Sequence, residues 1–349
     1  MYDNITDMKE VKKRILWVDI AKAFAILSVP ISHCLPLGTT LRALIFSVHM
    51  PLFFILSGFT TKLASDWKTV GKRLKKNFLY LILPTLGVIS IFAFTEAFKF
   101  GGIELFPSKV AWTLREFFIK NYPDGLYNAG AVWFLVALFN AKLIMDVVNT
   151  VIKSEKSGIV FFLFGALGIY MGVKGIRLPF FVDLALVASM FIEVGILWRK
   201  YEKTVKKYSV PLLLAAGAFW FSRVMRGDFL EFWTRFYAGY EISIFEAVAG
   251  SFVIGNIAMM LEESLKKAGK IQKKLMNALI VVGKNTMLLY LIHCLDTSIF
   301  NFWNFSVELG VFATCLTRLA LNLAIFVVIR NGYLLFKNRD KRKRDLKNS

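Results

Sequence analysis

Ten apolar runs, separated by short charged segments, constrain the fold of this chain more than any other feature. A helix needs ~20 apolar residues to cross the hydrocarbon core of a bilayer, and most of the runs approach that length. They fall at roughly 15–35, 42–61, 78–98, 129–149, 158–173, 179–198, 209–223, 241–261, 276–296 and 310–336. The fifth and seventh runs are the shortest. The pattern predicts an all-α integral membrane protein, a polytopic bundle of about ten transmembrane helices.

The composition excludes the other broad classes of protein. Of the 349 residues, 56% are hydrophobic and 19% are charged, whereas a water-soluble domain has about 25% charged residues. Three cysteines are too few for a disulfide framework in a chain of this length. The sequence shows no segment long enough for an appended soluble domain. Any catalysis is therefore expected within the helix bundle.

The net charge of +20 would fit a nucleic-acid-binding protein if it covered a folded surface. Instead, the basic residues alternate along the chain. With the N-terminus inside, 29 Lys and Arg residues lie in inner segments and nine in outer segments, and such residues are retained on the cytoplasmic side. We therefore expect both termini in the cytoplasm and no nucleic-acid partner. The predicted parts are a cytoplasmic N-terminus (1–14), a membrane domain (15–336) and a basic cytoplasmic tail (337–349).

Ionisable residues inside the first run need an explanation, because each costs ~2.5–3.5 kcal/mol at the centre of a membrane helix. Asp19, Lys22 and His33 fall on one face of a helix at 100° per residue. Lys22 and His33 are then roughly 16 Å apart along the axis, in the inner and outer halves of the membrane. An ion pair of Asp19 with Lys22 near the interface would be a purely structural alternative.

The chain has only three histidines, His33, His49 and His293. The predicted topology places all three in the outer halves of their helices. Histidine is the side chain best suited to take a proton from a hydroxyl near neutral pH, although a single buried histidine commonly just bonds a backbone carbonyl. Cys34 and Cys294 directly follow two of them, but neighbours in a helix do not face the same way. We expect no metal site, because no Cys or His pair has ligand spacing.

Two further groups of polar residues lie at helix ends or on helix faces. Lys72, Arg73 and Lys76 form a dense cationic cluster at the inner mouth of the third helix. Such a cluster is either the positive flank of a membrane helix, which meets anionic lipid, or a clamp for phosphate. On the ninth helix, Tyr290 and His293 share a face with Gly283 and Thr286, a seam that packing alone could explain.

These motifs, in this order, resemble a known family. Asp19-Ile20-Ala21-Lys22, His33 and the string from Ser47 to Gly58 are similar to the acyltransferase type 3 family of membrane O-acyltransferases, within it the fucose 4-O-acetylase-like group. The likeness continues through Arg73 to Pro84, Trp133-Phe134-Leu135, the helix from Leu178 to Gly195, and Gly283 to His293. The string SVHMPLFFILSG of the second helix is the most specific part.

The resemblance implies a ten-helix bundle that takes an acetyl or related acyl group from cytoplasmic acyl-coenzyme A, a co-substrate and not a tightly bound cofactor. The acceptor it implies is a hydroxyl of an envelope or extracytoplasmic glycan, or of a lipid-linked sugar. The family's basic residue and histidine on helix one match Lys22 and His33. Its paired-arginine motif matches only in part, as Arg73 with Lys76, and Lys is a weaker bidentate partner for phosphate than Arg.

The residues and the resemblance together lead us to expect three groups of site residues. The expected catalytic residues are His33, Lys22, Asp19 and His49. The residues expected to bind coenzyme A are Arg73, Lys76 and Lys72, and those expected to bind substrate are Trp133, Tyr290 and His293. We expect the protein in a bacterial plasma membrane, with the lipid bilayer as a further partner. A transporter or flippase of a lipid-linked sugar is the alternative function, although paired halves and matching broken helices are missing from the sequence.

Overall fold

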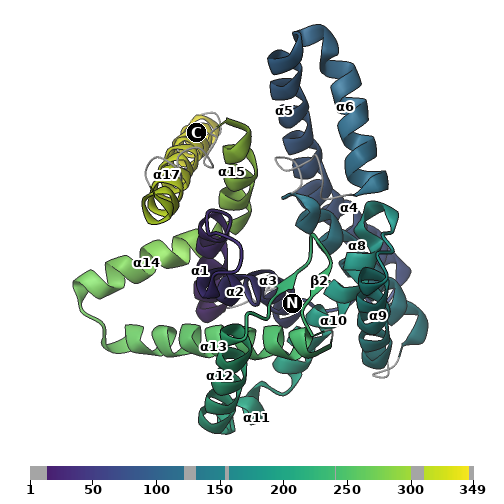
Figure 1. The fold of residues 1–349 in the computed structure, drawn as a ribbon. Coiled ribbons are helices and arrows are strands. Elements are labelled where there is room, and N and C mark those ends of the chain that lie inside the picture. Colours follow the sequence, from purple (N-terminus) through teal and green to yellow (C-terminus); the bar gives the residue numbers. More distant parts are fainter. Residues whose placement is uncertain (1–13, 122–130, 154–156, 240, 300–309, 346–349) are drawn as a thin grey trace, which may run out of the picture.

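The protein is a bundle of helices with one short hairpin, as a computed structural model shows for residues 14–121, 131–153, 157–239, 241–299 and 310–345 (Figure 1). The α-helices are α1 (Leu16–Ser32), α2 (Thr40–Phe46), α3 (His49–Thr60), α4 (Trp67–Asn77), α5 (Leu83–Phe100), α6 (Phe106–Arg115), α8 (Trp133–Ile152), α9 (Ser157–Val173), α10 (Val182–Lys200), α11 (Glu202–Lys207), α12 (Ser209–Met225), α13 (Glu241–Ser264), α14 (Lys270–Lys284), α15 (Thr286–Ile299) and α17 (Val311–Asp345). Short turns of 3₁₀-helix (η2, Ile103–Leu105; η4, Pro179–Phe181; η5, Leu265–Lys267) and π-helix (η1, Phe78–Ile82; η3, Glu116–Lys120) lie between them. The strands β1 (Leu230–Glu231) and β2 (Phe236–Tyr237) pair antiparallel.

Each of the ten apolar runs is mainly helical where the structure describes it, and the structure is 84% helical. Within the described residues, six helical segments are long and apolar enough to span a membrane, or seven if the bent pair of α14 and α15 is one span. The fifth and seventh runs form α9 and α12, which are apolar but only 17 residues long. The all-α polytopic membrane architecture is thus confirmed. Ten spans, and both termini in the cytoplasm, remain predictions.

Two of the predicted helices are interrupted. The second run forms α2 and α3 with a break at Ser47 and Val48. Pro51 explains it, because the proline ring clashes with the carbonyl four residues earlier, at Ser47. The ninth run was expected to be one straight helix, but α14 and α15 meet at Asn285 with a bend of 72°. The single helix face expected for Gly283 and His293 is therefore wrong, since the two residues lie on differently directed helices.

Two helices organise the core. In Figure 1, α1 lies near the middle of the molecule and packs against α3, α13, α14, α15 and α17. The second is α10, which packs against α3, α8 and α9. The helices α5 and α6 form a hairpin that projects beyond the other helices (Figure 1). Because α1 contacts helices from both halves of the chain, it can hold residues from distant segments around one site.

Glycine makes the closest helix crossings possible. A Cβ atom on Gly58 of α3 would overlap the backbone carbonyl of Ile192 on α10, and one on Gly195 of α10 would overlap that of Ile55. A Cβ atom on Gly283 of α14 would overlap the carbonyl of Asp19 on α1. The backbones are in direct contact at these points, which is the way small residues allow membrane helices to associate.

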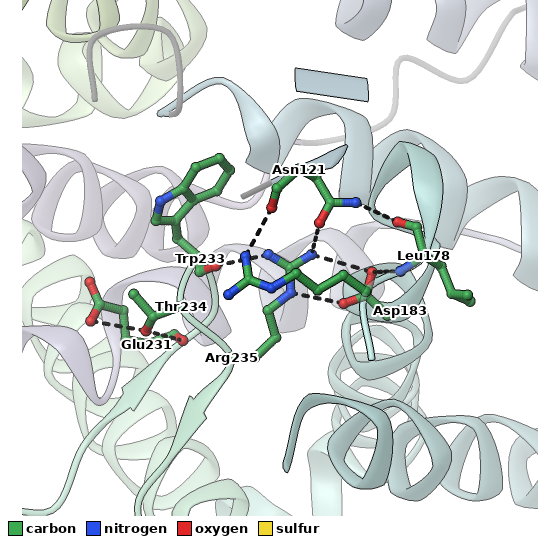
Figure 2. Close-up of polar contacts among 8 residues, drawn as sticks. Asn121, Leu178, Asp183, Glu231, Trp233, Thr234 and Arg235 are labelled. Atoms are coloured by element: carbon green, nitrogen blue, oxygen red, sulfur yellow. Dashed lines mark hydrogen bonds and ion pairs between the residues drawn. The ribbon is translucent and has the colours of Figure 1, made fainter. Parts of the chain in front are cut away.

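A buried polar network fixes the hairpin of β1 and β2 against the start of α10 (Figure 2). Arg235 donates to Asp183 from Nε at 2.9 Å and to the side-chain oxygen of Asn121 from Nη2 at 2.9 Å. Asn121 in turn donates to the carbonyl of Leu178 at 2.6 Å. The buried ion pair of Arg235 and Asp183, together with the hydrogen bonds of Asn121, thus links three segments that are far apart in the sequence.

We predict that Gly58→Ala and Gly195→Ala destabilise the protein by about 1–3 kcal/mol, because the added methyl group collides with backbone that has no alternative position. Gly87→Ala on α5 is the matched control. No atom lies within 4 Å of its added Cβ, and Ala is the better helix former by roughly 0.5–1 kcal/mol. Thermal unfolding in detergent measures all three. Equal midpoints for Gly58→Ala and Gly87→Ala would contradict the tight crossing.

Candidate active site

The three histidines converge at one end of the bundle. His33 is the residue that ends α1, and its ring stacks on that of His293 from α15 with centroids 5.4 Å apart. Phe46 of α2 contacts His33 at 5.8 Å and His49 at 5.1 Å. Residues from α1, α2, α3 and α15 therefore form one cluster, which we call the histidine cluster (His33, His49 and His293).

The three rings differ in their accessibility. His33 is exposed, whereas His49 and His293 are 4% and 3% exposed. His49 Nδ1 lies 2.7 Å from the carbonyl oxygen of Ile45, so this nitrogen is the donor and the side chain is satisfied by backbone. His33 is thus the exposed member of the three, and His49 makes the carbonyl contact common for buried histidines.

Behind His293 lies a buried ion pair. Arg318 of α17 donates to both carboxylate oxygens of Asp296, at 2.8 and 2.7 Å, and Asn322 donates to the same carboxylate at 2.8 Å. His293 Nδ1 lies 3.4 Å from Asp296 and 3.4 Å from Arg318. We call Asp296, Arg318 and Asn322 the α15–α17 network, because they join these two helices beside the histidine cluster.

Arg42 lies at the C-terminal end of α1, next to His33. Its Nη1 donates to the carbonyl of Ser32 at 2.9 Å, and its guanidinium lies over the ring of Phe46 at 4.1 Å. Glu231 of the hairpin lies 3.7 Å from it. Burial raises the pKa of the Glu231 carboxyl, and the positive charge of Arg42 acts in the opposite direction without cancelling this rise. A cation that satisfies the carbonyls at a helix C-terminus is favourable for the helix dipole.

The other polar residues of α1 lie at its opposite end. Asp19 is buried and pairs with Arg14, whose Nε lies 2.6 Å from the carboxylate. The structural alternative of an ion pair between Asp19 and Lys22 is therefore not what the structure shows. Eleven residues separate Lys22 from His33, a rise of roughly 16 Å. Asp19 and Lys22 thus act on the histidine cluster at most from a distance.

Lys22 instead belongs to a second group of charges. Lys142 of α8 lies within electrostatic reach of three other cations, Lys22, Arg73 and Lys76, and of one carboxylate, Asp146. Arg73 Nε lies 3.0 Å from Asp146, and Arg73 also donates to the carbonyl of Lys62. We call Lys22, Arg73, Lys76 and Lys142 the cationic cluster.

The cationic cluster has an excess of positive charge. Lys72 and Lys76 are exposed on α4, and no carboxylate of the described residues forms an ion pair with either. Asp146 is already held by Arg73 and by the backbone N–H of Ala64 at 2.9 Å. Since like charges repel at short range, the cluster favours a bound anion.

The two aromatic residues expected to bind substrate are packed into the core. Trp133 stacks on Phe232 with centroids 5.7 Å apart, and Tyr290 packs against Phe134 at 5.8 Å. The hydroxyl of Tyr290 donates to the carbonyl of Ala131. Both side chains are buried, so they shape an apolar wall of the bundle and lack the open ring face that stacking on a sugar needs.

The sequence interpretation missed Asp296, Arg318, Asn322, Asp146 and Lys142. A signal for them was present, because charged residues inside apolar runs are costly and therefore functional candidates. Asp296 and Arg318 can be identified as an ion pair only when the packing of their two helices is known, and the sequence does not reveal that packing. Lys142 likewise becomes a candidate only because cations of α1 and α4 lie near it.

Comparison with known proteins gives one match. The model of the acyltransferase 3 family, described as an acyltransferase domain, matches residues 15–330. No curated protein and no solved structure matches the chain. The matched range contains both the histidine cluster and the cationic cluster.

We predict that diethyl pyrocarbonate, which modifies imidazoles, reacts with His33 first, because His33 is an exposed residue while His49 and His293 are buried. Mass spectrometry after brief treatment of the membrane-embedded protein measures the modified fraction of each histidine. The chain has three histidines in all, so each can be followed. His33→Gln should remove the fast-reacting site. Faster modification of His49 or His293 would show that the accessible ring has been misassigned.

Proposed function

The chain belongs to the acyltransferase 3 family, and on that premise we propose that it transfers an acetyl or related acyl group from cytoplasmic acyl-coenzyme A to a hydroxyl group of an envelope glycan. The observation that supports this proposal is the placement of the two clusters at opposite ends of α1. One end offers cations for an anionic donor, and the other offers an accessible imidazole for a hydroxyl. Membership in the fucose 4-O-acetylase-like group, and the bacterial plasma membrane as location, belong to the same proposal.

The donor binds at the cationic cluster. Coenzyme A has a diphosphate and a further phosphate, and Lys22, Arg73, Lys76 and Lys142 together carry more positive charge than the carboxylate of Asp146 balances. Lysine and arginine are the usual partners of phosphate oxygens. Lys22 thereby takes a role in donor binding, which its distance from His33 favours over a direct role in catalysis.

The depth of the two clusters fits the shape of the donor. The charged nucleotide remains at the cationic end, and the uncharged pantetheine arm enters the bundle along α1. The ~16 Å rise from Lys22 to His33 separates the phosphate site from the reaction site. The thioester at the end of the arm then lies near His33, where an acceptor on the far side of the membrane meets it. This direction requires both termini in the cytoplasm, as the charge distribution predicts.

At the histidine cluster, the imidazole of His33 acts as general base. It takes the proton of the acceptor hydroxyl, and the oxygen forms a bond to the thioester carbonyl carbon. The carbon–sulfur bond breaks, sulfur leaves with the electron pair, and the proton passes from His33 to the coenzyme A thiolate. Transfer through an acyl-histidine intermediate uses the same residue. His49 and Trp133 stay in the proposal as residues that shape the pocket.

The test of this function is transfer of radiolabel from [1-¹⁴C]acetyl-coenzyme A in membrane vesicles. We predict that inside-out vesicles move label into glycan or lipid-linked sugar, and that sealed right-side-out vesicles do not, because the donor site faces the cytoplasm. His33→Gln should insert normally and lose transfer 10²-fold or more, since the amide cannot accept the proton. His49→Gln should retain more activity.

Two results would contradict the proposal. A flippase would leave the thioester intact while the glycan still crosses the membrane. Normal transfer by His33→Gln, with loss in His49→Gln at equal membrane level, would move the base to α3.

We predict that Lys142→Gln and Lys76→Gln raise the KM for acetyl-coenzyme A by about tenfold and change kcat little, because phosphate contacts exist before and during transfer. Lys75→Gln is the matched control, since Lys75 is exposed on the same helix as Lys76 and is not among the cations that act on Lys142. Initial rates at varied donor concentration separate KM from kcat. An unchanged KM in both variants would show that these cations only flank a membrane helix and do not bind the donor.

A further inference from the structure

Three hydrogen bonds converge on the buried carboxylate of Asp296. Arg318 supplies two, from Nε at 2.8 Å and from Nη2 at 2.7 Å, and Asn322 supplies the third at 2.8 Å. All three residues are at most 2% exposed. A carboxylate with this many short contacts is held in one position. It is the fixed point of the α15–α17 network.

The network is costly if its purpose is only to join two helices. Each charged residue within a membrane helix costs ~2.5–3.5 kcal/mol, and a buried ion pair often stabilises a fold no better than apolar side chains of the same volume. Leucine side chains at these positions could also pack α15 against α17. The retained charges therefore point to a task besides packing.

The pair of Arg235 and Asp183 provides a comparison within the same chain. It is similar to the α15–α17 network in burial and has a short ion-pair distance of 2.9 Å, and it also has an amide side chain beside it, although Asn121 accepts from Arg235 whereas Asn322 donates to Asp296. Its carboxylate contacts backbone at Leu178 and has no histidine partner (Figure 2). Asp296 differs in one respect that concerns chemistry, because His293 Nδ1 lies 3.4 Å from it.

The network reaches His33 by two routes. His293 contacts Asp296 on one side and stacks on His33, with an angle of 26° between the rings. Arg318 Nη1 also lies 3.7 Å from the sulfur of Cys34, the residue that directly follows His33. Both members of the ion pair therefore contact residues that adjoin the exposed His33.

We propose that Asp296, fixed by Arg318 and Asn322, is a positioning residue of the transfer reaction, which orients His293 and, through the stacked His293 ring, the substrate-facing His33. This proposal rests on the proposed function, in which His33 takes the proton of the acceptor hydroxyl. A carboxylate that holds one nitrogen of an imidazole fixes the ring and its tautomer. Here the carboxylate acts one ring further away, with His293 as the intermediate. A general base that is misplaced by about 1 Å loses as much as 10²-fold in rate.

The test replaces the ion pair with neutral amides of nearly the same shape. In the double variant Asp296→Asn/Arg318→Gln no buried charge is left unpaired, so the protein should accumulate in the membrane as the wild type does. We expect kcat for label transfer from [1-¹⁴C]acetyl-coenzyme A to fall about tenfold or more, with the KM for the donor within about twofold. Asp296→Glu, which keeps the carboxylate, should retain more turnover than Asp296→Asn.

The matched control is the double variant Asp183→Asn/Arg235→Gln, which removes an ion pair of equal burial away from the histidines. It should keep the kcat and KM of the wild type once its membrane level is taken into account. The same loss of kcat in both double variants, or wild-type kcat in both, would overturn the proposal, because the α15–α17 network would then be only a structural link. A donor KM that changes with kcat would do so as well.

The proposed function can fail independently. If the wild type moves no label to any acceptor, acyl transfer from acetyl-coenzyme A is refuted. If the wild type moves label and Asp296→Asn/Arg318→Gln does so with normal kcat, only the positioning role of Asp296 is refuted.

Discussion

The backbone crossing of α1 and α14 is the constraint on which the site depends. Gly283 lets α14 touch α1 at the carbonyl of Asp19, a contact that any side chain would prevent. The chain then bends by 72° at Asn285 and α15 runs on in a new direction. That change of direction carries His293 to the far end of α1, where it stacks on His33.

Because α1 is shared by both clusters, it couples two chemically different environments. One end gathers an excess of cations around Lys142, and the other gathers imidazoles with only one of them exposed. In the proposed reaction, a charged donor stays at the surface while its thioester reacts inside. A single helix of 17 residues that joins the two ends meets this requirement with little freedom of movement between them.

Buried ion pairs serve the protein in two ways. The pair of Arg235 and Asp183 holds a hairpin on the bundle through contacts to backbone and amide groups. The pair of Arg318 and Asp296 is similarly buried, yet its carboxylate is next to His293. Charge and burial are equal in the two cases, so they do not decide the role of a pair. The neighbouring side chain decides it.

The sequence by itself determined the all-α membrane architecture and the family, because apolar length is a property of consecutive residues and the motif around His33 and His49 is local. It also brought forward all three histidines as candidates from their number alone. Only the tertiary structure decided that His49 is satisfied by a carbonyl, that Lys22 faces the cations and not His33, and that Asp296 and Arg318 form a pair. Those facts depend on how helices cross and bend, and crossing is set by backbone contact between residues hundreds of positions apart, which no periodicity within one helix records.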